Sequence, residues 1–214
     1  SGRVFGVTEA GVRIEPFPIP THWPRIVGID FGYDHPAAAV WMAWDRDTDT
    51  LYIYDCWRAS GQTPAMHAVT IRARGAWIPV AWPHDGLQHD KGSGIVLAQQ
   101  YRTNGVAMLK NRATFEDNTS SGFEAGISQM MDRFQARQIR VFSHCTEWFE
   151  EFREYHRKDG LVVKLRDDLM SATRYAMMMR RYAKTEAEVV GINARNAAIP
   201  TSQQFGVLDQ SIGY

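Results

Sequence analysis

The apolar segment Arg25–Gly32 (RIVGIDFG) constrains the fold of this chain more than any other part of the sequence. Such a run of aliphatic residues is typical of a strand that is buried on both faces of a sheet. Asp30 lies inside the run, and a buried, ionised carboxylate costs free energy unless it is hydrogen-bonded, paired or bound to a cation. The segment therefore predicts a central strand in which Asp30 either caps a turn before Gly32 or binds a cation.

Two further segments predict strands beside this one. Residues 36–44 and 51–58 are rich in strand-forming residues, and the polar stretch 45–49 separates them. Short turns of this kind join antiparallel neighbours, so the three segments together predict an antiparallel meander.

After residue 60 the sequence changes to alternating helical and strand patterns. We expect helices over 63–74, 94–101, 123–137, 146–158 and 167–184, and short strands over 78–82, 106–109 and 139–142. A three-strand meander followed by βα units predicts an α/β fold with a mixed sheet and helices on both faces. This order of elements resembles the ribonuclease H-like fold.

The composition divides the chain into three parts. Residues 1–24 contain four prolines and predict a leader or linker with one short strand at 12–14. Residues 25–190 predict the folded domain, and residues 191–214 predict a flexible tail because they are small, polar and aperiodic. No stretch approaches the roughly 20 apolar residues of a membrane span, so we expect no association with a membrane.

The charges of the chain are balanced, with 24 Lys and Arg against 24 Asp and Glu. This balance argues against a protein that binds polyanions over its whole surface, because such proteins have a basic excess. Contact with DNA would need a local basic patch or a second domain. Lys91, Lys110 and Arg112 fall in predicted loops or near strand ends and are candidates for contact with a DNA backbone.

Three further aspartates lie at the ends of predicted elements. Asp85 follows the strand 78–82, where functional groups of α/β sheets gather, although Asp is also an ordinary turn residue. Asp167 and Asp168 begin the last predicted helix, where they either cap it or face a site.

These aspartates together predict a metal-dependent catalytic site. Asp30, Asp85, Asp167 and Asp168 are expected to converge at one edge of the sheet, and their carboxylate oxygens suit Mg²⁺ or Mn²⁺. Two such ions can stabilise the attacking and leaving oxygens of a phosphodiester displacement. Candidate auxiliary groups are His84 and Asp90.

Several stretches resemble the nuclease domain of the large terminase subunit of tailed phages. Residues 30–38 (DFGYDHPAA) fit its pattern DxGxxxPxA, and residues 167–176 (DDLMSATRYA) resemble its closing helix, DHxxDAxRYA. Residues 53–57 resemble its third strand and residues 84–86 its second acidic position. The likeness covers about residues 25–185.

This resemblance implies that Asp30, Asp85 and Asp167 or Asp168 hold two divalent ions. Ser171 stands where the helix motif has its second Asp, and Asp168 stands where the motif has His. The choice between Asp167 and Asp168 therefore stays open.

The resemblance also implies an endonuclease that cuts concatemeric double-stranded viral DNA during genome packaging, in the cytoplasm of a phage-infected bacterium. Its implied partners are the terminase ATPase domain, the small terminase subunit and the portal or procapsid. The sequence has no GxxxxGK[ST] loop, so the ATPase motor is not expected in this chain. Two alternatives stay open: another ribonuclease H-like nuclease (a junction resolvase, a transposase-like enzyme or an RNA–DNA hybrid nuclease), or a DNA-binding module without catalysis.

Overall fold

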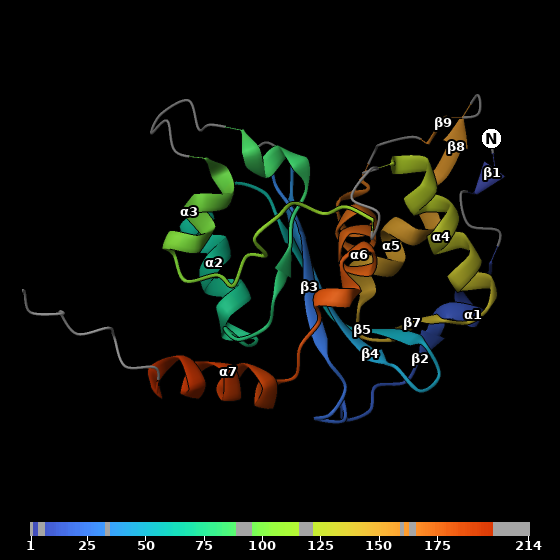
Figure 1. Cartoon of the computed structure of the whole chain (residues 1–214). Coiled ribbons are helices and arrows are strands. Elements are labelled where there is room, and N and C mark those ends of the chain that lie inside the picture. Colours follow the sequence, from blue (N-terminus) through green and yellow to red (C-terminus); the bar gives the residue numbers. More distant parts are fainter. Residues whose placement is uncertain are drawn as a thin grey trace, which may run out of the picture.

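The computed structural model describes residues 2–3, 7–32, 35–88, 96–115, 122–158, 161–162 and 166–198. At its centre is a mixed sheet of six strands in the order β2-β7-β5-β4-β3-β6 (Figure 1). These strands are β2 (Arg13–Ile14), β3 (Arg25–Asp30), β4 (Ala37–Asp45), β5 (Thr50–Ala59), β6 (Val80–Ala81) and β7 (Ile139–Phe142). A three-stranded sheet consists of β1 (Gly2–Arg3), β8 (His156–Lys158) and β9 (Leu161–Val162).

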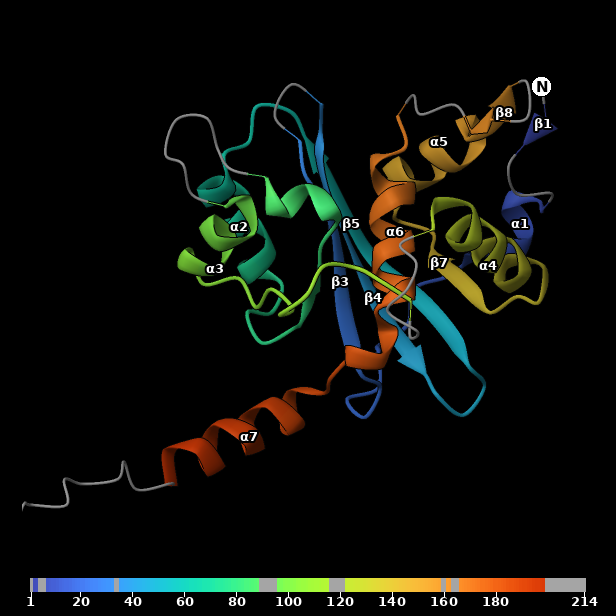
Figure 2. The same cartoon turned by 45° about the horizontal axis from the view of Figure 1, so that its top comes forward.

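Helices cover both faces of the six-stranded sheet (Figures 1 and 2). One face carries α2 (Pro64–Ala73) and α3 (Leu97–Thr103). The other face carries α4 (Phe123–Gln135), α5 (Thr146–Glu154) and α6 (Asp168–Met178). The remaining elements are α1 (Glu9–Val12), the 3₁₀ turns η1 (His84–Leu87) and η2 (Arg180–Tyr182), and α7 (Glu186–Ala198).

The central strands have the predicted arrangement. β3, β4 and β5 form an antiparallel meander, with Val27 opposite Trp41 and Val40 opposite Cys56. β6 lies parallel to β3, and β7 lies parallel to β5. The expected α/β architecture with a mixed sheet and helices on both faces is therefore confirmed.

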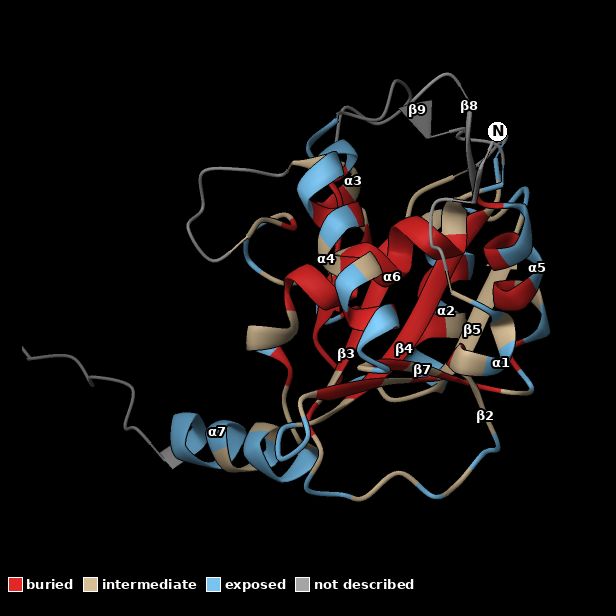
Figure 3. Ribbon diagram, turned by 90° about the vertical axis from the view of Figure 1, so that its right-hand side faces the viewer, coloured by how far each residue is buried: buried red, intermediate tan, exposed pale blue. Residues whose placement is uncertain are grey.

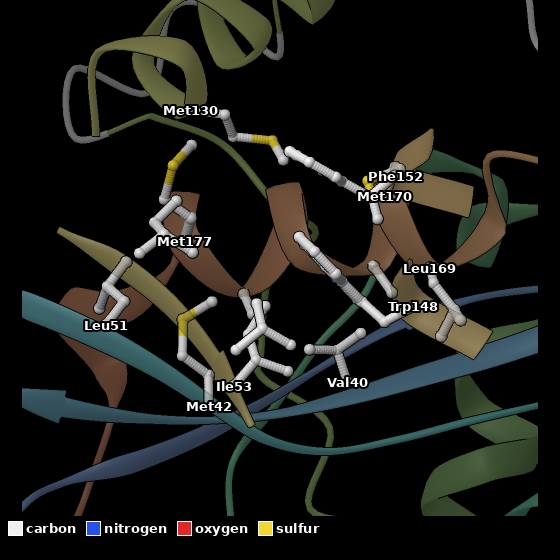
Figure 4. Packing of buried hydrophobic residues seen from close by; sticks show 14 of the residues in the cluster. Val40, Met42, Leu51, Ile53, Met130, Trp148, Phe152, Leu169, Met170 and Met177 are labelled. Atoms are coloured by element: carbon white, nitrogen blue, oxygen red, sulfur yellow. The ribbon is translucent and has the colours of Figure 1, made fainter. Parts of the chain in front are cut away.

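Alternation along the central strands divides the core in two. Val40 and Met42 of β4 pack beneath α5 and α6, as Figure 4 shows. Val27 of β3 and Trp41 of β4 pack on the opposite face, beneath α2 and α3. Successive residues of a strand point to opposite faces, so each central strand supplies apolar side chains to both cores. This explains why the predicted central strands are apolar almost without interruption.

Gly28 allows α6 to lie directly against β3. A Cβ atom at Gly28 would overlap the backbone of Ala172 and come within 2.9 Å of the Cβ atom of Ala176. Gly is the residue that permits such a close approach between a strand and a helix. Most of α6 is buried as a result, and Figure 3 shows it largely in red while α7 is pale blue.

The composition of residues 1–24 predicts a leader or linker, and the described residues 7–24 contribute a strand and apolar side chains to the domain. Arg13–Ile14 form β2, close to the short strand expected at 12–14, and this strand pairs in parallel with β7. Val12 is fully buried. An unpaired edge of β7 would leave its N–H and C=O groups open, and β2 covers part of that edge. The folded domain therefore begins before Arg25.

Several predicted elements are shorter in the structure: the helix expected over 167–184 ends at Met178, the strand expected over 78–82 is Val80–Ala81, and two others change further. The helix expected over 146–158 ends at Glu154, because His156–Lys158 form β8 and pair with β1. The strand expected over 106–109 is reduced to a single bridge to β6. For the helix expected over 146–158, pairing with a segment distant in the sequence overrides the local helical pattern.

The last helix crosses the boundary expected at residue 191. α7 continues to Ala198, and residues 199–214 of the predicted tail lie outside the described residues. A reciprocal cap begins this helix: the N–H of Glu188 donates to Oγ1 of Thr185, and the N–H of Thr185 donates to Oε2 of Glu188. Neither α7 nor any other helix in the described part of the chain is long and apolar enough to cross a membrane.

Gly28→Ala is expected to lower the free energy of unfolding by about 1–3 kcal/mol, the usual cost of overpacking a core. The new methyl group would overlap α6. The control is Gly191→Ala in α7, where a Cβ atom meets nothing within 4 Å; its stability should stay equal or rise by up to about 1 kcal/mol. Urea unfolding followed by circular dichroism measures both, and equal stability of Gly28→Ala and wild type would contradict the close approach.

Candidate metal centre

Four aspartates line one pocket of about 390 Å³ at the edge of the sheet where β3 ends. Asp30 is the last residue of β3, Asp85 lies in η1 after β6, and Asp167 and Asp168 lie at the start of α6. The other described residues that line this metal pocket are Phe31, His35, Pro36 and Arg166. The three chain segments thus come together at one edge of the sheet.

Strand alternation turns Asp30 toward α6. Ile26 and Gly28 lie four and two residues before Asp30, and both pack on the α6 side of the sheet. Asp30 therefore points to the same face. β6 lies parallel to β3 with Ala81 opposite Gly28, so η1 begins at the edge where β3 ends. This pairing is what brings Asp85 to the pocket of Asp30.

A side chain from another helix holds the start of α6. Glu151 of α5 is fully buried, and its Oε2 accepts the backbone N–H groups of Leu169 at 2.7 Å and Met170 at 3.2 Å. The side chain of Asp167, the residue before the helix, makes no capping hydrogen bond. Because Glu151 satisfies the helix donors, the carboxylate of Asp167 lines the pocket and does not cap the helix.

Arg58 of β5 connects Glu151 to the sheet. Its Nη1 donates to Oε1 of Glu151 at 2.8 Å, and its Nη2 donates to Oε2 of Glu150 at 3.0 Å. In the sheet, Asp30 is paired with Ala38, and Ala38 is paired with Arg58. Directly paired residues share a face, so these three side chains form one row beneath α6. A continuous series of contacts therefore runs from the strand row through Glu151 to the start of α6.

The electrostatics of the pocket disfavour ionised Asp30. Burial, followed by the negative charges of Asp168 and Asp167, raises the pKa of Asp30 to about 8, while Arg174 acts in the opposite direction. Burial and the charge of Asp167 also raise the pKa of Asp168. Carboxyl groups with such shifts cluster at functional sites. A cation in the pocket would favour the ionised forms of both groups.

The donor set of the pocket fits a hard divalent cation. All four aspartates offer carboxylate oxygens, which are the ligands that Mg²⁺ and Mn²⁺ prefer. Within the described part of the chain, no three His, Cys, Asp or Glu side chains are already grouped closely enough to hold one ion. A bound cation would reduce the repulsion between these carboxylates.

The other predicted site residues lie elsewhere or are not described. His84 is exposed in η1 beside Asp85, but it does not line the metal pocket. Asp90 and Lys91 lie outside the described residues. Lys110 and Arg112 line a different pocket, on the other side of η1.

Sequence analysis missed Glu151 and Arg58. A signal for Glu151 exists, because helical spacing places it on the same face as Trp148, Phe152 and Tyr155, which are all buried. An acidic residue on the apolar face of a helix indicates a buried partner. Arg58 has no comparable signal, because its role depends on how α5 packs over β5.

Glu151→Ala is expected to lower the free energy of unfolding by about 3 kcal/mol, because it removes the acceptor of Nη1 of Arg58 and of the buried N–H groups of Leu169 and Met170. The matched control is Glu150→Ala, which removes the other partner of Arg58, but that side chain is 54% exposed. Its effect should stay below about 1 kcal/mol. Urea unfolding compares the two variants, and equal losses would show that Glu151 has no special role.

Asp30→Asn is expected to stabilise the metal-free protein at about pH 9 by more than about 1.4 kcal/mol, the free energy of one pKa unit. The pKa of Asp30 in the folded state lies above its value in the unfolded chain. Folded stability is therefore lost as the pH rises from roughly 4 to 8. Thermal unfolding is measured in a chelator at roughly pH 5 and pH 9. Between these two pH values Asp30→Asn should lose less stability than wild type, and an identical loss of stability would contradict the assignment.

Comparison with known proteins places the chain in a family. Residues 27–180 match the family model of the terminase RNaseH-like domain. The large terminase subunit of Salmonella phage P22 is 42% identical over 190 residues, which are 88% of this chain and 38% of that protein. The chain therefore spans well under half the length of this relative.

Solved structures agree with the family match. The structure of the P22 large terminase nuclease domain has a TM-score of 0.82 and 41% identity, and covers 88% of this chain and 97% of that chain. The nuclease domain of the large terminase from bacteriophage SPP1, solved with bound Mn, has a TM-score of 0.55 at 17% identity, over 79% of this chain and 94% of that chain. The SPP1 likeness supports the fold alone. The chain thus has the ribonuclease H-like fold that the order of its elements predicts, and it belongs to the family of terminase RNaseH-like domains.

Proposed function

We propose that this chain is a divalent-cation-dependent endonuclease that cuts double-stranded, concatemeric viral DNA during genome packaging. The convergence of Asp30, Asp85, Asp167 and Asp168 on one pocket is the observation that carries this proposal. The P22 domain that the chain resembles is described as a nuclease domain, and the SPP1 domain was solved with bound Mn.

Asp30 is the central ligand in this proposal. It lies at the end of a buried strand among other acidic groups, so its ionised form needs a cation. Asp85 approaches from η1 and is exposed, which leaves its carboxylate free to adjust. Asp167 and Asp168 both line the pocket from the start of α6, so we propose that this pair supplies the ligand from that helix.

We assign Mg²⁺ or Mn²⁺ as the cofactor, because all the donors are carboxylate oxygens. We propose two ions, because phosphodiester displacement has both an attacking and a leaving oxygen to stabilise. When bound, such ions supply Lewis-acid stabilisation of the attacking and leaving oxygens in phosphodiester hydrolysis. The residues of the chain hold and orient the reacting groups. His84 precedes Asp85 in η1 without lining the metal pocket, so we assign it an auxiliary role only, outside the set of ligands.

Double-stranded DNA is the proposed substrate, and the terminase ATPase domain is the main proposed partner. The chain spans 38% of the P22 large subunit, so a protein of that length has room for a further domain. The whole chain has zero net charge. A tethered domain that binds DNA would raise the effective concentration of DNA at the metal pocket. The small terminase subunit and the portal or procapsid are further proposed partners, in the cytoplasm of an infected bacterium.

Asp30→Ala is expected to reduce cutting of plasmid DNA in Mn²⁺ by more than about 100-fold, because even residues that support metal ligands are worth about 10–100-fold. Agarose gels of supercoiled plasmid measure the rate. Asp47→Ala is the matched control, since Asp47 is exposed in the turn at the opposite end of β4 and should not affect the rate. Cutting by Asp30→Ala at the wild-type rate would refute the site.

A panel of substrates separates the proposed activity from the alternatives. Linear duplex, a four-way junction and an RNA–DNA hybrid are compared under the same conditions, with a chelator as the negative control. Preferred cutting of linear duplex supports the proposal. A preference for the junction or the hybrid would indicate another ribonuclease H-like nuclease. No cutting of any substrate, together with no Mn²⁺ binding in isothermal titration calorimetry, would indicate a non-catalytic module.

A further inference from the structure

A second pocket, of about 350 Å³, lies next to the metal pocket across η1. Its described lining residues are Trp82, Leu87, Lys110, Asn111, Arg112 and Thr114. Asp85 and Phe31 line the metal pocket, whereas Leu87 and Trp82 line the second one. Gly86 fits so tightly between these two walls that a Cβ atom there would lie 2.5 Å from the ring of Trp82 and 3.0 Å from that of Phe31. Gly86 therefore lies between one wall of each pocket, with Asp85 before it in the chain and Leu87 after it.

The second pocket is cationic, in contrast to the metal pocket. Lys110 is exposed and Arg112 half-buried, and no acidic side chain is among its described lining residues. Nη1 of Arg112 is buried and has no hydrogen-bond partner in the described structure. No acceptor within the described structure therefore offsets the charge of Arg112 at Nη1. Asn111 and Thr114 add neutral groups that can donate hydrogen bonds.

The segment that carries Arg112 is held in place by the protein itself. The N–H of Ala113 donates to the carbonyl oxygen of Trp82 at 2.7 Å. Nη1 of Arg181 donates to the carbonyl oxygen of Thr114 at 3.1 Å. A segment fixed before binding loses little conformational entropy when a ligand arrives.

We propose that this second pocket binds a backbone phosphate of the DNA whose scissile phosphate lies at the metal pocket. This inference rests on the proposed nuclease function. A phosphodiester supplies the negative charge that Lys110 and Arg112, which both line this pocket, can neutralise. The second pocket also lies beside four carboxylates that line the metal pocket and repel DNA. An attractive contact at this place would therefore favour the binding of duplex.

The test measures DNA binding separately from cutting. Fluorescence anisotropy gives the Kd of a labelled duplex at several salt concentrations, in an Asp30→Asn background that is expected not to cut. Arg112→Gln should reduce the slope of log Kd against log salt by about 0.9, the value of one phosphate contact. Lys110→Gln changes an exposed side chain, cannot disturb the core, and should also reduce the slope. The control is Arg46→Gln, an exposed cation just beyond the far end of β4, which should leave the slope unchanged.

Unchanged slopes in both variants would overturn the phosphate site, while cutting by the parent protein would leave the nuclease proposal intact. Absence of cutting by the wild-type protein would refute the nuclease proposal, whatever the slopes of the variants are. Inorganic phosphate is compared with chloride at equal ionic strength to distinguish the source of the anion. A different result would be that phosphate competes with DNA in the parent protein but not in Arg112→Gln, while the slope of log Kd against log salt is unchanged. That result would assign the pocket to free phosphate and reject the DNA contact.

Discussion

The geometry of the candidate site depends on the hydrogen bonds that Glu151 makes with the start of α6. Burial raises the pKa of Glu151 to about 7, although its hydrogen bond with Arg58 acts to lower it. A buried carboxylate is tolerated there because Arg58 and the N–H groups of Leu169 and Met170 satisfy its oxygens. The same bonds fix where α6 begins relative to β5. Asp168, the first residue of α6, is fixed with it.

The close packing of α6 on β3 is a second constraint on the position of this helix. Gly28 has no side chain, so α6 lies directly on β3, and two residues later the same strand supplies Asp30. Within the core, Nε1 of Trp148 donates to Oγ1 of Thr173 at 2.9 Å, and that hydroxyl donates to the carbonyl oxygen of Leu169 at 2.7 Å. α6 is thus attached to both β3 and α5. Ligands carried by elements held in this way are positioned more accurately than ligands on loops.

The sequence predicts those parts of the fold that leave a local pattern. The strand over 139–142 has the predicted bounds, and Asp30 stands out because it is the only charged residue between Ile26 and Gly32. The convergence of the aspartates follows from topology once the strands are known. By contrast, the pairing of β2 with β7, the early end of α5 and the cap from Glu151 depend on contacts between segments far apart in the chain. A local stretch of sequence does not indicate which distant segment it will contact, so these features are seen only in the structure.

Under the proposed function, the two pockets also explain how a chain without net charge would bind a polyanion. Its charges are separated, with four carboxylates on one side of η1 and Lys110 and Arg112 on the other. Without a cation, the carboxylates repel the DNA that the basic side would attract. Under the proposed function, a divalent ion removes this repulsion and therefore raises the affinity for DNA. Linkage makes the effect reciprocal, so bound DNA raises the affinity for the cation by the same factor, and the metal pocket fills most readily when substrate is present.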